Sequence, residues 1–130
     1  MTQPAYAPLP AFDILMAIHE VENPRDLQTP GAHGELGPHQ LTCDTWRRYT
    51  LLPFTPQYVC DPKIEEVVAL KHLRWIESEL KKAGVVPTVF RVAVAWNGGI
   101  EPAVTLWMEP STADYAKRVV NLVKLMEDSR

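Results

Sequence analysis

Two glutamates lie near the end of the first predicted helix, in the stretch AIHEVENP that runs from Ala17 to Pro24. Glu20 and Glu22 point to opposite sides, because two residues turn an α-helix by about 200°. A helix over residues 11–22 is expected to end there, since the residue before a proline is pushed out of the helical region and residue 23 is an asparagine before proline. Glu22 then lies where the following loop begins, and Glu20 is expected on the solvated side.

The position of Glu22 favours acid–base chemistry. Unpaired carbonyls give the end of a helix a partial negative charge, and this charge disfavours a carboxylate. Apolar neighbours disfavour it further, so the Glu22 side chain is expected to hold its proton near neutral pH. A carboxylic acid of this kind can protonate a leaving oxygen. Position alone favours the simpler interpretation, a solvated glutamate at a helix end.

The loop that follows is rich in glycine. GAHGELGPHQLTCDTW, residues 31–46, has three glycines in its first seven residues and then Pro38 and Gln40. Glycines allow the backbone to approach a ligand closely. A loop of this kind, followed by a helix cap, predicts a cleft wall built from main chain, and this makes a chemical role for Glu22 the better interpretation.

Helix signals follow this loop. We expect a short helix over residues 43–49 with Thr42 as its N-cap, and irregular structure over residues 51–60, which contain two prolines. The next helix has the clearest start in the chain, with Asp61 as N-cap and Pro62 at the first helical position, and Gly84 ends it. Its apolar face is expected to include Val67 and His72, the latter as a histidine hydrogen-bonded at the edge of the core.

The last third of the chain contains one ambiguous segment and one helix. Residues 85–99 are rich in valine, which allows a buried strand or a central helix. Ser111 to Asp114 resembles a capping box that starts a last helix with Tyr115 on its apolar face. Phe12 is expected on the apolar face of the first helix. We therefore predict one mainly helical domain of about five helices over residues 11–130, after a flexible lead-in over residues 1–10.

Composition limits the classes of function. The chain has 130 residues, which is the length of one domain, and 13 basic against 16 acidic residues give it a net charge of −3. This balance argues against a nucleic-acid partner. The sequence has no run long enough for membrane insertion and no signal-peptide pattern at its N-terminus. Cys43 and Cys60 have no metal-ligand spacing, and both a disulfide and two free thiols remain open.

Four short motifs, in order, resemble the lysozyme-like superfamily, and most of all its soluble lytic transglycosylase-type domains. That family has a helix ending in a catalytic glutamate, a Gly-x-x-Gln motif, an Ala-Tyr-Asn-x-Gly motif and a tyrosine on a late helix. The matches in this chain are Glu22, residues 37–40, residues 95–98 and Tyr115. The order and approximate gaps hold from about Phe12 to Val123.

The resemblance implies a lysozyme-like helical fold around a glycan-binding groove, and peptidoglycan glycan strands as the partner. The implied reaction is cleavage of the β-1,4 bond between N-acetylmuramic acid and N-acetylglucosamine, with Glu22 as general acid and then base. Gln40, Asn97 and Tyr115 would hold the sugar, and His39 and Trp96 belong to the same substrate-binding set. The implied place of action is the cell wall, in the periplasm or outside the cell, and delivery by a phage or a secretion system fits a chain without a visible signal peptide.

Three positions depart from the family pattern. Asn23 replaces the usual serine, His39 stands where methionine is common, and Trp96 replaces a tyrosine. Tryptophan can still stack on a sugar, but its only polar group is an N–H donor. These departures keep open an alternative class, a non-catalytic glycan-binding or interaction module that retains the groove.

Two further alternatives concern the chemistry. An inverting lysozyme needs a second carboxylate about 6.5–9.5 Å from the acid, and Glu35 is the best candidate, whereas a transglycosylase needs none. A metal site would draw on residues that lie within 21 positions of one another: His19, Glu20, Glu22, His33 and His39. There is no HExxH motif, so we predict no metal and no other cofactor.

Overall fold

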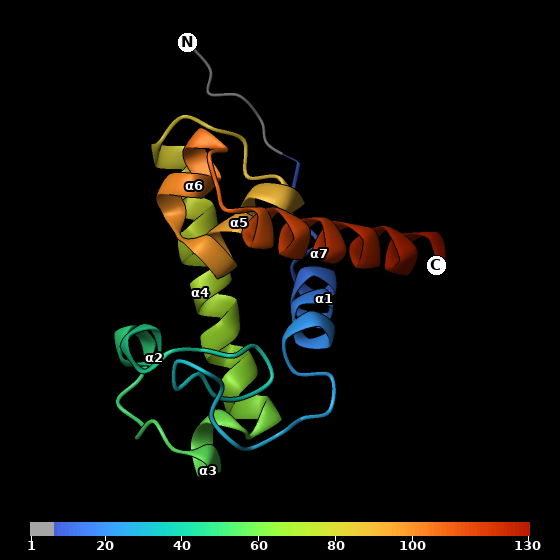
Figure 1. Cartoon of the computed structure of the whole chain (residues 1–130). Helices are drawn as coiled ribbons and strands as arrows, with labels where there is room; N and C mark the ends of the chain where they lie inside the picture. The colour runs from blue at the N-terminus through green and yellow to red at the C-terminus, as the bar shows by residue number, and fades with distance from the viewer. Residues whose placement is uncertain (1–6) are drawn as a thin grey trace.

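The computed structural model describes residues 7–130, and seven α-helices lie within them (Figure 1). Their bounds are α1 Ala11–Glu22, α2 Cys43–Tyr49, α3 Pro56–Val59, α4 Pro62–Lys82, α5 Val89–Gly98, α6 Ile100–Thr105 and α7 Pro110–Asp128. The prediction of a mainly helical domain is confirmed. The described residues contain two helices more than the five expected, and these are the short helices α3 and α6.

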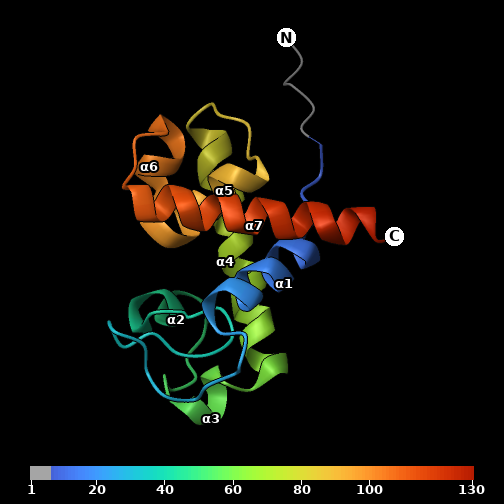
Figure 2. The same cartoon turned by 45° about the vertical axis from the view of Figure 1, so that its right-hand side comes forward.

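Helix α4 runs through the molecule and the other elements gather at its two ends. Helices α5, α6 and α7 lie at its C-terminal end, whereas α2, α3 and the loop over residues 23–42 surround its N-terminal end (Figures 1 and 2). Helix α1 packs against both α4 and α7. The last turn of α1 is therefore directed toward the loop.

Two hydrophobic cores correspond to these two ends. The larger core joins buried residues of α1, α4, α5, α6 and α7. The smaller core lies under the loop and consists of Leu36, Leu41, Trp46, Val59 and Val68. Trp96 packs against both cores, so the end of α5 that carries it lies at their junction.

Asn23 both ends α1 and anchors the loop. Helix α1 stops at Glu22, as predicted from the following Asn-Pro pair. The buried Asn23 side chain donates through Nδ2 to the carbonyl oxygens of Leu27 (3.0 Å) and Gly37 (3.2 Å), and its Oδ1 accepts from the Leu27 N–H at 2.9 Å. The loop is therefore tied to the residue that directly follows Glu22.

The predicted start signals of α2 and α4 are confirmed. Thr42 Oγ1 accepts a hydrogen bond from the Thr45 N–H at 3.2 Å at the start of α2. Asp61 Oδ1 accepts from the N–H groups of Lys63 and Ile64, and Pro62 occupies the first position of α4. These caps satisfy N–H groups that no helical carbonyl reaches.

The ambiguous segment over residues 85–99 forms a helix. Thr88 Oγ1 caps α5 by accepting from the Arg91 N–H at 3.1 Å. Helices α4, α6 and α7 enclose α5, and this explains why the segment is apolar on nearly every side. Residues 51–60 are irregular except for the short helix α3, which was not predicted because the segment contains two prolines.

Three finer predictions are wrong. The Ser111–Asp114 capping box does not form, because α7 begins at Pro110 with Glu109 as its N-cap and Ser111 therefore lies inside the helix. Phe12 is 62% exposed, since α1 buries the side that carries Ile14 and Ile18. Val67 is 54% exposed, because the buried side of α4 lies elsewhere.

The remaining expectations concern the chain ends, the membrane and the cysteines. Residues 1–6 of the predicted lead-in lie outside the described residues, and Leu9 packs against the larger core. No helix among residues 7–130 has both the length and the apolar character that crossing a membrane requires. Cys43 and Cys60 are free thiols, so the structure favours the second of the two alternatives.

Gly37 offers a test of how tightly the loop packs on α3. Gly37 has φ +84°, and a Cβ added to it would lie 2.4 Å from the backbone oxygen of Val59. We expect Gly37→Ala to lower the free energy of unfolding by about 2–4 kcal/mol, through backbone strain and overpacking together. Gly34→Ala is the matched control, because Gly34 has φ +81° and nothing within 4 Å of the added atom. Equal losses for both variants in urea denaturation would contradict the close packing.

Candidate active site at the end of helix α1

Glu22 occupies the last position of α1, and its carboxyl is half-buried. Burial, the largest cause, and the nearby Glu35 carboxylate together raise the pKa of Glu22 from 4.5 to about 7, although the charge of His39 acts to lower it. The carboxyl therefore holds its proton up to about neutral pH, as the sequence predicted, although burial rather than the helix end is the main cause. Glu20 is exposed, as expected.

The loop places Gln40 in a tight turn. Leu36 and Leu41 exchange backbone hydrogen bonds of 3.1 and 3.0 Å, which close the turn over residues 37–40. Gln40 has φ +51°, a left-handed conformation that is uncommon for a residue with a side chain. Its side-chain Nε2 donates to the Gly37 carbonyl at 2.9 Å, so the amide is held in place from within the turn.

Gln40 and Glu35 both lie against the backbone of Gly31. A Cβ added to Gly31 would lie 2.8 Å from Gln40 Oε1 and 3.2 Å from Glu35 Oε1. Glu35 Oε1 also accepts a hydrogen bond from the His33 N–H at 2.6 Å. Because Gly31 has no Cβ, the Gln40 amide oxygen and the Glu35 carboxylate can both approach its main chain. The Glu35 carboxylate is also the one that raises the Glu22 pKa.

Tyr115 reaches this site from α7. Its ring is buried, and its hydroxyl has no hydrogen-bond partner among residues 7–130. Burial raises the pKa of Tyr115 well above its ordinary value, and the nearby Glu22 charge raises it further. The Tyr115 hydroxyl is thus a buried donor close to a carboxyl whose hydrogen bond is not made within the described residues.

Trp96 and Asn97 lie at the end of α5. Trp96 is half-buried, and its indole N–H donates to the His39 carbonyl at 3.2 Å, so only its ring surface remains for another contact. Asn97 is exposed, and its Oδ1 accepts from the Thr112 hydroxyl. No contact among the described residues joins Asn97 to the Glu22 site.

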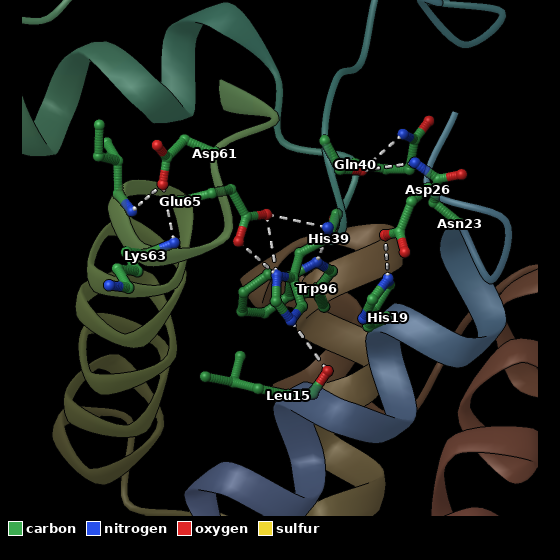
Figure 3. Close-up of polar contacts among 12 residues, drawn as sticks. Leu15, His19, Asn23, Asp26, His39, Gln40, Asp61, Lys63, Glu65 and Trp96 are labelled. Atoms are coloured by element: carbon green, nitrogen blue, oxygen red, sulfur yellow. Dashed lines mark hydrogen bonds and ion pairs between the residues drawn. The ribbon is translucent and has the colours of Figure 1, made fainter. Parts of the chain in front are cut away.

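His39 lies behind the site rather than in it. The ring is buried, its Nδ1 lies 2.7 and 2.8 Å from the two oxygens of Glu65, and its Nε2 lies 2.9 Å from the Leu15 carbonyl (Figure 3). Both ring nitrogens are therefore occupied, and the direct substrate contact expected of His39 has no free polar atom to make it.

Sequence reasoning missed Glu65. This glutamate is fully buried in α4, on the same side of the helix as Ala69, Leu73 and Ile76. A charged residue in register with an apolar stripe was the available signal, because a carboxylate is rarely enclosed without a partner. The predicted apolar face included Val67, which is exposed, and did not include Glu65.

The structure thus brings together Glu22, Glu35, Gln40 and Tyr115, with Trp96 and the buried His39 behind them. Within residues 7–130, no three side chains of histidine, cysteine, aspartate or glutamate lie close enough together to hold a metal ion. The arrangement provides one acid with a pKa near neutrality, one nearby carboxylate, the Gln40 amide and the Tyr115 hydroxyl.

The raised pKa of Glu22 predicts a pH-dependent stability. The folded state binds the Glu22 proton more tightly than the unfolded chain does, so this contribution to stability is present below pH 4.5 and is lost as the pH rises toward about 7. Glutamine mimics the protonated acid. We expect Glu22→Gln to match the wild type near pH 4 and to exceed its stability by about 1–2 kcal/mol at pH 8, measured by denaturation across pH. A difference independent of pH would contradict the raised pKa.

Comparisons of this chain with protein-family models, with curated proteins and with solved structures give no match. The function must therefore be inferred from the geometry of the chain's own residues. The arrangement around Glu22 is the part of that geometry with chemical consequences.

Proposed function

We propose that this chain cleaves peptidoglycan glycan strands at the β-1,4 bond between N-acetylmuramic acid and N-acetylglucosamine. The observation that carries the proposal is the half-buried Glu22 carboxyl, whose pKa of about 7 suits it to give and take a proton near neutral pH. The resemblance of its motifs to lytic transglycosylase-type domains supplies the substrate class. The lysozyme-like groove and the enzymatic activity are parts of this proposal.

Glu22 would act twice in the reaction. It donates its proton to the glycosidic oxygen as the bond to the anomeric carbon breaks, and it becomes a carboxylate. That carboxylate then accepts a proton from the sugar's own C6 hydroxyl, which attacks the anomeric carbon and gives an anhydro product. Attack by water instead gives a hydrolysed product, and in either case Glu22 regains the proton that it donated.

The surrounding residues would orient the sugar. Gln40 and Tyr115 approach the Glu22 site from the loop and from α7, and their polar groups suit a ring hydroxyl and an acetamido group. Trp96 can contribute its ring surface, because its N–H is already donated to His39. The exposed Asn97 would contact a sugar farther from the reacting bond.

Peptidoglycan clearing by the purified protein tests this proposal. We expect wild type to clear a peptidoglycan gel and Glu22→Gln to lose activity by about 10³-fold or more, because the variant cannot donate the proton. Glu20→Gln is the matched control, since Glu20 is exposed on the opposite side of α1 and its loss leaves clearing intact. Mass spectrometry of the fragments distinguishes the anhydro product, which is lighter by one water. Binding without clearing would instead support a non-catalytic glycan-binding module.

An inverting hydrolase with Glu35 as general base is the second candidate. The observation that favours it is the effect of the Glu35 carboxylate on the Glu22 pKa, which brings the two carboxyls into one site. An inverting reaction needs a carboxylate that can activate water on the far side of the sugar.

Glu35→Gln separates the two reactions. Removal of the Glu35 charge lowers the pKa of Glu22, so the activity is expected to decline at a lower pH than in wild type. A general base would in addition cost about 10²–10⁴-fold in maximal rate, whereas a purely electrostatic role leaves that rate within about tenfold. An unchanged pH–rate profile would show that Glu35 does not act on Glu22.

A further inference from the structure

Within residues 7–130, the buried Glu65 carboxylate forms hydrogen bonds with one residue, His39. Its Oε2 accepts a hydrogen bond from the His39 backbone N–H at 2.9 Å, and both of its oxygens face His39 Nδ1. Glu65 is fully enclosed and His39 is 6% exposed. A carboxylate enclosed in this way is retained only where donors satisfy it, and here a single residue supplies both donors.

Every polar atom of His39 is engaged. In addition to the contacts with Glu65, its Nε2 faces the Leu15 carbonyl at 2.9 Å, and its own carbonyl accepts from Trp96 at 3.2 Å. A carbonyl only accepts, so Nε2 must carry a proton, while Nδ1 faces a carboxylate that already accepts the backbone N–H. A doubly protonated imidazolium beside an ionised carboxylate makes all of these contacts, and a neutral ring that accepts from a protonated Glu65 makes them equally; the first is the arrangement proposed below.

We propose that Glu65 is a positioning residue of the Glu22 site that acts through His39. Glu65 anchors the turn over residues 37–40, which contains Gln40, to helix α4. It also keeps a positive charge on His39, near the Glu22 carboxyl. Figure 3 shows the Glu65 side chain extending from α4 toward His39, and it shows Leu15 and Trp96 on the other sides of His39. The charge and the geometry belong to the chain itself; only the consequence for catalysis rests on the proposed function.

Other titratable groups lie near the Glu65–His39 pair, and they are more exposed to solvent than Glu65. The His19 ring lies 5.9 Å from the His39 ring, but His19 pairs with the exposed Asp26 at 2.6 Å, where solvent screens the charges. Glu66 is exposed and lines, with Glu65, a hollow of about 270 Å³ between α1 and α4.

On the remaining sides lie the site and α5. Glu22 and Glu35 are the carboxyls of the site, and Tyr115 stays protonated there. Beyond Trp96 lies His72, whose ring is 4.9 Å from the indole. Burial lowers the pKa of His72 to about 4, so it is neutral near pH 7. Among the groups that act on the Glu22 pKa, His39 is the one that lowers it.

Glutamine at position 65 removes the charge and can keep the hydrogen bonds. Its amide oxygen can accept from the His39 backbone N–H, and its amide N–H can donate to a neutral Nδ1. His39 then keeps only the proton on Nε2, which still donates to the Leu15 carbonyl. Because the positive charge of His39 lowers the Glu22 pKa, we expect that pKa to rise in Glu65→Gln.

NMR of the full chain tests this directly. In wild type, ¹⁵N shifts of His39 are expected to show both ring nitrogens protonated at pH 7. In Glu65→Gln, His39 should show one protonated nitrogen, and ¹³C titration should give Glu22 a higher pKa than in wild type. Glu66→Gln is the matched control: it removes the same charge from the adjacent, exposed position and should change neither reading.

Two results would overturn the proposal. The first is a neutral His39 in wild type at pH 7, which is decisive even if Glu65→Gln does not fold. The second is a Glu22 pKa that stays the same or falls in a folded Glu65→Gln, because a merely structural Glu65 would leave it unmoved. These readings need no activity, so failure to clear peptidoglycan refutes the proposed function and leaves this inference standing. In an active enzyme, Glu65→Gln should in addition keep its activity to higher pH than wild type.

Discussion

The polar contacts of His39 are the constraint on which the candidate site depends. This one residue joins the turn over residues 37–40 to α4 through Glu65, to α1 through Leu15 and to α5 through Trp96. Each of these groups is buried or half-buried. If one of these hydrogen bonds broke, its donor or acceptor would have neither a protein partner nor water, and this costs free energy. The turn therefore cannot move relative to three helices without a large cost, and the Gln40 amide is held with it.

Glu22 illustrates the opposite use of burial. Glu65 is enclosed but fully partnered, which suits an ionised carboxylate. Glu22 is half-enclosed and near another carboxylate, and both features disfavour its ionised form. The fold thus contains two carboxyls in contrasting environments, one fully hydrogen-bonded and one able to exchange a proton near neutral pH. This contrast is typical of sites that perform acid–base chemistry.

Much of the helical framework could be predicted from local signals. The end of α1 before Pro24, the Thr42 cap and the Asp61-Pro62 start all appear where the sequence placed them, because caps and prolines act within one turn of the chain. Short helices such as α3 and α6 gave no periodic pattern. The expected capping box failed because α7 begins earlier, at Pro110 with Glu109 as its N-cap, so Ser111 lies inside the helix.

The sequence by itself determined that Glu22 ends a helix, that a glycine-rich loop follows it and that Glu20 faces solvent, because all three depend on spacing along the chain. Only the tertiary structure decided which residues surround Glu22. It paired His39 with Glu65, 26 residues later, and placed Tyr115 from α7 beside the acid. The charge state of a side chain depends on what encloses it, and enclosure by distant helices is not encoded in any single stretch of sequence.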